Sequence, residues 1–256
     1  MDKIVFFDID GTLLDYDKTI SESTKAGIEL LKRNGIFVAI ATGRAPFMFE
    51  TIRQELDIDS YVSLNGQYVV FENQRIYSRP LDKDVFHALA NDSNRNNHPL
   101  VYLTEDCMIA NRDNHPMIQE SLDSLHFPYP EVDKDFYQSR EIYQSLLFCE
   151  EGEERYYVKH YPMFEFIRWH PFSVDVLPKG GSKAIGIQKM IEKLGVKMEQ
   201  TIAFGDGLND VEMLKTVGTG VAMGNAHPNA KSVSQFVTKD VDEDGIFYAL
   251  KELKLI

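Results

Sequence analysis

Short apolar runs that end in polar residues alternate with amphipathic stretches near both ends of the chain. Ile4 to Phe7 is too short and too rich in β-formers for a helix, so it predicts a buried parallel strand. Ser21 to Asn34 has helical character and stops at Gly35. This order of strand, loop and helix is typical of βαβ units and predicts an α/β fold with a parallel sheet. Further strands are expected at Ile36–Ala41, Tyr61–Leu64, Thr201–Phe204, Gly220–Met223 and Gln235–Val237, and further helices at about 46–56, 182–194, 210–215 and 245–253.

The alternation of predicted strands and helices is interrupted in the middle of the chain. A hairpin is expected over residues 68–77, and the composition then shifts toward aromatic residues, His, Pro and Asn. The polar stretch Asn91–Asn97 is expected to be a loop. We therefore expect a discontinuous core, residues 1–81 and 179–256, interrupted by an inserted α+β domain over residues 82–178. Its strand candidates include Leu100–Leu103, Gln144–Phe148 and Phe164–Leu177.

Charge and composition narrow the function. The formal net charge of −13 argues against a nucleic-acid partner, and an enzyme for phosphate esters would need strong local positive charge from a metal and a lysine. No apolar stretch approaches the roughly 20 residues that span a bilayer, and the first strand begins without a signal-like segment, so neither a membrane span nor export is expected. Cys107 and Cys149 form no CxxC pair, which fits a reducing cytoplasm.

Two carboxylates, Asp8 and Asp10, follow the first predicted strand, at the edge where open α/β sheets bind ligands. Residues two apart on a strand share a face, so both can point to one site. One ionised carboxylate can attack phosphorus and form an aspartyl-phosphate, while a neighbour gives a proton to the leaving oxygen. We expect Asp8 to be the nucleophile and Asp10 the acid/base. The alternative is that both are turn residues.

A second acidic loop, Asp206 to Asp210, follows a later strand. Mg²⁺ prefers hard oxygen ligands and usually takes one or two carboxylates. Asp8, Asp206 and the main-chain oxygen of Asp10 could supply these ligands, while Asp210 would orient a ligand or a bound water. The alternative is a helix N-terminus rich in capping residues.

Candidate phosphate contacts come from two further places. Thr42-Gly43 ends the second strand, where a hydroxyl and an amide could hold phosphate oxygens, although a simple strand-to-helix turn explains this pair equally well. Lys183 begins a helix after Ser182, so its ammonium and the helix N-terminus could both face an anion. The alternative for Lys183 is a solvated side chain.

Taken in order, these pieces resemble the motifs of the haloacid dehalogenase superfamily of phosphotransferases. They are DIDGTL at 8–13, Thr42, Lys183 and GDGLND at 205–210. ATGR at 41–44, LNG at 64–66, SKA at 182–184 and AMGNA at 222–226 are similar to its Cof-like, sugar-phosphatase-type branch. The resemblance covers the whole chain and implies a Rossmann-like three-layer parallel-sheet core with an inserted C2-type (IIB) cap that governs substrate specificity.

The resemblance also implies a role for each matching residue. Asp8 would be nucleophile and Mg²⁺ ligand, Asp10 acid/base and ligand through its carbonyl, and Asp206 the third protein ligand, with Asp210 as a supporting carboxylate. Phosphate-binding positions would be the main chain of Ile9 together with Thr42, Gly43, Lys183 and Asn209. Candidate substrate contacts are Arg44 and Asn65 in the core and Arg168, Trp169 and His170 in the cap, where the alternative is a half-buried strand.

These expectations describe a cytoplasmic Mg²⁺-dependent phosphatase that hydrolyses small phosphate monoesters, such as sugar phosphates, under a mobile cap. The nearest alternative is a phosphomutase, in which a phosphosugar takes the phosphoryl group from Asp8 instead of water. A second alternative is a non-catalytic phosphometabolite sensor, against which the intact Asp8 and Asp10 argue. We expect a small phosphorylated metabolite as partner, no nucleic acid or membrane, and a monomer or weak homo-oligomer.

Overall fold

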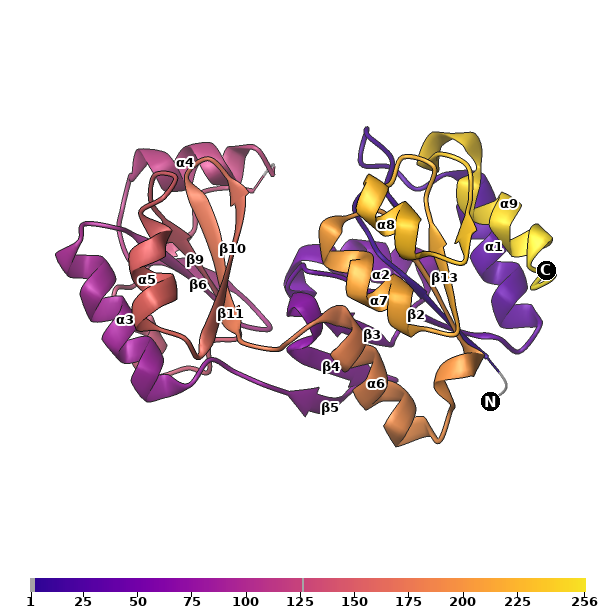
Figure 1. Cartoon of the computed structure of the whole chain (residues 1–256), viewed down its shortest axis with the longest axis horizontal. Coiled ribbons are helices and arrows are strands. Elements are labelled where there is room, and N and C mark those ends of the chain that lie inside the picture. Colours follow the sequence, from indigo (N-terminus) through magenta and orange to yellow (C-terminus); the bar gives the residue numbers. More distant parts are fainter. Residues whose placement is uncertain (1–2, 126) are drawn as a thin grey trace. The chain divides into compact units, whose positions relative to one another are not determined.

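The computed structural model describes residues 3–125 and 127–256, which form two compact units, each with its own sheet (Figure 1). We call them the core unit and the cap unit. The core unit consists of the described residues up to Arg44 together with Met48–Ser78 and Ser182–Ile256, and the cap unit consists of Ala45–Phe47 and Arg79–Gly181.

The described part of the core unit contains an eight-stranded sheet in the order β14-β13-β12-β1-β2-β3-β4-β5. β14 to β3 run parallel, and β4 and β5 are added antiparallel. All four residues of β1 are fully buried, which confirms the predicted strand Ile4–Phe7. The strands are β1 Ile4–Phe7, β2 Phe37–Ala41, β3 Tyr61–Ser63, β4 Tyr68–Phe71, β5 Gln74–Ser78, β12 Thr201–Gly205, β13 Thr219–Ala222 and β14 Phe236–Val237.

Helices cover both faces of this sheet, which confirms the predicted three-layer α/β class. α1 packs against α9 on one side, and α6, α7 and α8 follow one another on the other side (Figure 1). Three helix starts have side-chain caps: Ser21 accepts from the Thr24 amide, Ser182 from the Ile185 amide, and His227 from the Asn229 amide. The helices are α1 Glu22–Arg33, α2 Glu50–Leu56, α6 Lys183–Leu194, α7 Val211–Thr216, α8 Pro228–Val233 and α9 Gly245–Glu252.

The cap unit has a second sheet in the order β10-β11-β9-β6-β7-β8, in which only the described pair β7 and β8 is parallel. Its apolar core lies between one sheet face and two helices, since Phe86 and Leu89 of α3 and Tyr157 of α5 cluster with Val174 and Val176 of β11. The elements are α3 Lys83–Arg95, β6 Leu100–Leu103, β7 Met108–Ala110, α4 Pro116–Asp123, β8 Glu131–Val132, β9 Gln144–Phe148, α5 Glu154–His160, β10 Phe164–His170 and β11 Ser173–Pro178.

The predicted loop Asn91–Asn97 is wrong, because α3 continues to Arg95. A tertiary contact fixes this polar segment as helix: the Asp92 carboxylate accepts hydrogen bonds from the hydroxyls of Tyr156 and Tyr161. The helix ends only where Asn97 takes a left-handed conformation with φ of 61°. The polar composition of this segment favours a loop, but packing against α5 stabilises the helix instead.

Two other predicted boundaries also need correction. The candidate strand Phe164–Leu177 is a hairpin of two antiparallel strands that turns at Pro171 and Phe172, since proline cannot donate a ladder hydrogen bond. The helix expected from residue 46 begins as a 3-10 turn over Pro46–Phe49 before α2.

Two negative findings concern the described residues. No helix among them combines the length and apolar character that a membrane span requires. Cys107 and Cys149 are both free thiols.

Gly66 fixes the approach of the loop after β3 to the start of α6. Its φ is 91°, and a Cβ atom at this position would overlap the main-chain oxygen of Ser182. We expect Gly66→Ala to lower the free energy of unfolding by about 3 kcal/mol or more, through steric overlap and backbone strain. Gly35 is a matched control, because its φ is 73° but a Cβ there meets nothing within 4 Å, so Gly35→Ala should cost only about 1 kcal/mol. Equal urea unfolding curves for the two variants would contradict this explanation.

Candidate active site

The predicted site residues of the core unit gather at the carboxyl ends of its parallel strands. Asp8 follows β1, Thr42 follows β2 and Asp206 follows β12, and these three strands lie near one another in the sheet. Lys183 is the first residue of α6. This is the edge at which open α/β sheets bind ligands.

Lys183 lies at the centre of the buried part of this site. Its ammonium contacts Asp8 Oδ1 at 2.5 Å and Asp210 Oδ1 at 2.6 Å, and all three side chains are almost completely buried. Burial opposes the charged amine, but the carboxylates of Asp210 and Asp8 outweigh it and raise the pKa of Lys183. The alternative of a solvated lysine is therefore wrong.

Three carboxylates converge beside this lysine. Asp8, Asp206 and Asp210 each present an oxygen, and the three oxygens lie within 4.8 Å of one another. Burial raises the pKa of Asp8 well above its ordinary value; Lys183 opposes this shift, and the charges of Asp210 and Asp206 add to it. Such crowded negative charge and hard oxygen donors fit a divalent cation such as Mg²⁺.

The second acidic loop is held by its own carboxylate. Asp210 Oδ2 accepts hydrogen bonds from the main-chain amides of Asp206 and Gly207, at 3.0 and 2.8 Å. Since its other oxygen accepts from Lys183, Asp210 already has three donors. Fewer hydrogen bonds hold the Asp206 side chain than hold Asp210: Thr12 Oγ1 donates to Asp206 Oδ1 at 3.1 Å. A Cβ atom on Gly11, whose φ is 76°, would overlap the Asp206 carboxylate.

Asp10 points to cations other than Lys183. Arg44 forms a bidentate ion pair with its carboxylate: Nε donates to Oδ2 at 2.8 Å and Nη2 donates to Oδ1 at 2.7 Å. Lys18 Nζ lies 2.9 Å from Oδ1. Burial alone would raise the pKa of Asp10, but the hydrogen bonds and charges of Arg44 and Lys18 outweigh it and lower the pKa. Arg44 and Lys18 thus favour the ionised form of Asp10.

The remaining predicted phosphate-binding residues lie at the same sheet edge. Thr42 is buried, and its hydroxyl accepts from the Arg44 amide at 3.1 Å. Asn209 Nδ2 donates to Asn65 Oδ1 at 3.4 Å, and a Cβ atom on Gly43 would lie 3.0 Å from that same oxygen. Ile9, between the two catalytic candidates, is fully buried. Gly43, Asn65 and Asn209 are thus brought together.

Sequence reasoning missed three residues of this network. Thr12 lies in the DIDGTL motif and Asn225 in the AMGNA motif, but the motifs alone do not indicate what these two side chains contact. Asn225 ties two loops together, because its Nδ2 donates to the Gly11 carbonyl and its Oδ1 accepts from the Val241 amide. Lys18 carries no such signal, since a lysine in a polar loop is usually solvated.

The half-buried Asp206 carboxyl gives the metal-free protein a testable pH dependence. Burial first, and then the charge of Asp210, raise the pKa of Asp206 to about 6 from 3.8. A raised carboxyl pKa contributes stability below the unfolded-state value, and this contribution is lost as pH rises through the folded-state value. With EDTA present, we expect Asp206→Asn to lose less stability than wild type between about pH 4 and pH 7. Parallel urea midpoints for the two proteins across this range would contradict the assignment.

Comparison with known proteins identifies the family. A family model described as haloacid dehalogenase-like hydrolase matches residues 5–250. The chain belongs to the haloacid dehalogenase-like hydrolases. This family match confirms the resemblance drawn from the sequence motifs.

Relatives of this haloacid dehalogenase-like hydrolase carry phosphatase names. The chain is 52% identical over 254 residues to "Putative phosphatase YkrA" of Bacillus subtilis (strain 168), covering 99% of this chain and 98% of that protein. It is 31% identical over 262 residues to the 5-amino-6-(5-phospho-D-ribitylamino)uracil phosphatase YitU of the same strain, covering 97% and 96%. The solved structure of the subclass IIB sugar phosphatase BT4131 has a TM-score of 0.86 and 33% identity, covering 99% of this chain and 100% of that chain. The protein is thus an enzyme of the phosphatase type, as predicted.

Two of the three cap candidates have structural partners. Arg168 pairs with Glu154 at 2.5 Å and donates to the Pro171 carbonyl at 2.7 Å. His170 Nδ1 lies 3.0 Å from the Ser121 hydroxyl. Trp169 differs from both, because its indole N–H faces the Asp175 carboxyl group, whose pKa it lowers, but has no hydrogen bond of good geometry with any residue that the structure describes.

Proposed function

We propose that this hydrolase uses Mg²⁺ to hydrolyse small phosphate monoesters, sugar phosphates or similar metabolites, through an aspartyl-phosphate on Asp8. The observation that carries the proposal is the buried contact of Lys183 with Asp8 beside Asp206 and Asp210. A carboxylate and a phosphate repel each other, so a carboxylate nucleophile needs cations around it. The buried ammonium supplies one such cation, and the converging carboxylates can hold another.

The first chemical step belongs to Asp8 and Asp10. A carboxylate oxygen of Asp8 attacks phosphorus, the bond from phosphorus to the leaving oxygen breaks, and Asp10 gives that oxygen a proton. In the second step water attacks phosphorus, Asp10 takes a proton from the water, and the Asp8 carboxylate is regenerated as phosphate leaves. Asp10 therefore ends the cycle protonated, ready for another first step.

The ionised state of Asp10 fits only one of these steps. Bound by Arg44 and Lys18, it can accept a proton but has none to give. For the first step, these two cations have to turn away from Asp10. The phosphate group offers them an anion in exchange, and Arg44 suits this exchange because its planar guanidinium binds phosphate as readily as carboxylate.

Asp8, Asp206 and the main-chain carbonyl of Asp10 would hold Mg²⁺. When bound, the ion would offset charge on the phosphate so that the anionic Asp8 can approach it. Asp210 is a poorer ligand because its carboxylate already accepts from Lys183 and from the amides of Asp206 and Gly207. It holds the loop and the lysine in place.

The remaining predicted contacts divide between phosphate and leaving group. We assign the phosphate to the main chain of Ile9, the Thr42 hydroxyl, Gly43, Lys183 and Asn209. Arg44 and Asn65 are the core-side residues that we assign to the substrate. We assign substrate selectivity to the inserted domain predicted over residues 82–178, which falls within the cap unit. The relatives support a hydroxyl-rich substrate, since one is a sugar phosphatase and another removes phosphate from a ribityl compound. Cytoplasmic location and a monomeric or weakly associated state stay predictions.

Phosphate release from a panel of phosphorylated metabolites, with Mg²⁺ or with EDTA, tests the function. The expected result is release that requires Mg²⁺ and yields the free alcohol together with phosphate. Recovery of an isomeric phosphosugar without free phosphate would favour the phosphomutase instead. Release that is unchanged by EDTA would contradict the metal assignment.

A further inference from the structure

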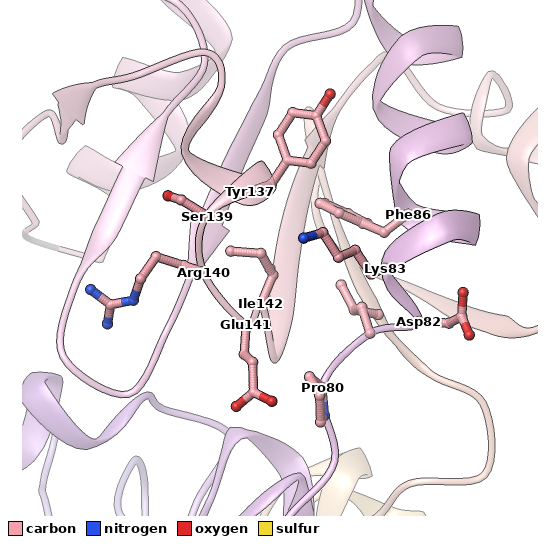
Figure 2. A pocket seen from close by; sticks show the side chains of 10 residues that line it. Pro80, Asp82, Lys83, Phe86, Tyr137, Ser139, Arg140, Glu141 and Ile142 are labelled. Atoms are coloured by element: carbon pink, nitrogen blue, oxygen red, sulfur yellow. The ribbon is translucent and has the colours of Figure 1, made fainter.

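The cap unit has a pocket of about 370 Å³ beside Phe86 (Figure 2). Two of its charged side chains are already engaged, since Lys83 donates to the Gln138 carbonyl and Arg140 pairs with Asp106 at 2.7 Å. These groups leave a ligand little charge to bind. The edge of the cap sheet offers more.

The described cap sheet ends at β10 on one side and at β8 on the other. An edge strand presents main-chain N–H and C=O groups that can pair with another chain, and proteins commonly prevent this with a short strand, a lysine or a proline. β8 follows this rule, because it has only two residues. β10 has seven, its segment Phe164–Arg168 contains neither lysine nor proline, and its bulge comes only after Arg168. The edge at β10 is therefore open to pairing.

The register with β11 shows which main-chain groups of β10 point outward. The Lys179 amide donates to the Met163 carbonyl at 3.0 Å, and hydrogen-bonded pairs in an antiparallel ladder recur at every second residue. Ile167 therefore also bonds to β11, whereas Phe166 and Arg168 direct their N–H and C=O groups away from it. Among the described loops and helices, none offers these outward groups a main-chain hydrogen bond.

The side chains of this edge suit an apolar partner strand. Ile167 is 42% exposed and Met163 is 61% exposed, and residues four apart lie on the same face of a strand. Arg168 brings little free charge to the edge, because its guanidinium already pairs with Glu154 at 2.5 Å. A strand that docks here would gain hydrogen bonds and apolar contact from the same short segment.

We propose that β10 pairs antiparallel with β10 of a second copy of this chain, so that two cap sheets join into one. With a two-fold axis at Ile167, Phe166 of each copy lies opposite Arg168 of the other, and each such pair exchanges two hydrogen bonds. The segment is complementary to itself in this register. Ile167 meets Ile167, an arginine meets an aromatic ring, and Glu165 is placed near Trp169 and not near another carboxylate.

The net charge of the chain predicts how tight this dimer is. Each copy carries a formal charge of −13, so two copies repel each other at long range. A contact through one strand edge is also small compared with the interface of an obligate dimer. We therefore expect a weak dimer that tightens as salt is raised from about 0.05 M to about 0.5 M, because salt screens the repulsion.

Sedimentation equilibrium of the intact protein over a wide range of concentrations tests the proposal. Wild type should show a reversible monomer–dimer equilibrium. Ile167→Lys should weaken the dimer by at least about tenfold, because two ammonium groups would face each other across the two-fold axis. Its urea midpoint should stay close to that of wild type, since the Ile167 side chain is largely exposed. Val132→Lys is the matched control: Val132 is 45% exposed on β8, the opposite edge, so its dimer should match that of wild type within about twofold.

Amide hydrogen exchange of wild type gives a second measurement that needs no variant. The Phe166 and Arg168 amides should exchange more slowly as protein concentration rises, whereas the Ile167 amide, bonded to β11, should be protected at every concentration. A wild type that stays monomeric throughout would overturn the proposal. So would a dimer that Ile167→Lys leaves intact, or one whose formation does not slow exchange at Phe166 and Arg168. None of these outcomes bears on the proposed phosphatase function, which phosphate release measures separately.

Discussion

Asp8→Asn is expected to reduce phosphate release by at least about 10⁴-fold, because an amide cannot attack phosphorus as a carboxylate does. The variant should still fold, since Asn removes a charge from a buried position where two other carboxylates already crowd it. Rapid quenching of wild type with substrate should give a mass gain of one phosphoryl group on the peptide that contains Asp8. The variant should show no such gain.

Asp17→Asn serves as the control for this experiment. Asp17 is an exposed carboxylate in the loop that follows the same motif, so its loss should leave turnover within about twofold of wild type. Substantial turnover by Asp8→Asn, or a phosphoryl group found on another residue, would mean that Asp8 is not the nucleophile.

Lys183→Met is expected to damage both stability and turnover. Without the ammonium, the carboxylates of Asp8 and Asp210 are left buried without their cation, which typically costs about 3–5 kcal/mol of unfolding free energy. Turnover should fall by roughly 10²-fold to 10³-fold, as it does when a group that stabilises developing negative charge is lost. Urea unfolding in EDTA and kinetics in Mg²⁺ measure the two effects separately.

A second lysine of the same helix provides the comparison. Lys189 is half-exposed and pairs with Glu192 at 3.2 Å, so Lys189→Met should change stability by less than about 1 kcal/mol. Mg²⁺ should restore part of the stability of Lys183→Met, because a bound cation would offset the same carboxylates. If Lys183→Met were as stable as wild type in EDTA, the buried ion pairs would not hold the site together.

The sequence predicted which residues meet at the carboxyl edge of the core sheet, because the determinants of their positions are local. Apolar runs define β1, β2 and β12, and the residue that follows each run is placed at the sheet edge by the strand itself. Serine caps and glycine stops likewise mark α1 and α6 within a few residues. Local signals of this kind need no knowledge of which segments meet.

Features that depend on distant partners were not predictable. Residues 91–95 are helical because Asp92 contacts Tyr156 of α5 and Tyr161, which follows that helix, and both tyrosines lie far along the chain. Lys18 reaches Asp10 only because the intervening loop folds back on itself, with Leu14 bridged to Asp10. That Gln144 Oε1 has no hydrogen-bond partner within the described residues is visible only once every neighbouring donor has a position.

The position of β1 between β2 and β12 has a consequence for synthesis of the chain. β2 follows β1 closely, but β12 and the Asp206 loop are translated only after the whole cap unit. At roughly 5–20 residues per second, the main-chain N–H and C=O groups on one edge of β1 wait on the order of ten seconds for their partner strand. The cap unit is contiguous apart from Ala45–Phe47 and can complete its sheet during this interval. Asp8 is therefore made first, Lys183 later and the Asp206 loop last of the three, so a chain that is released early from the ribosome carries Asp8 without the residues that complete its site.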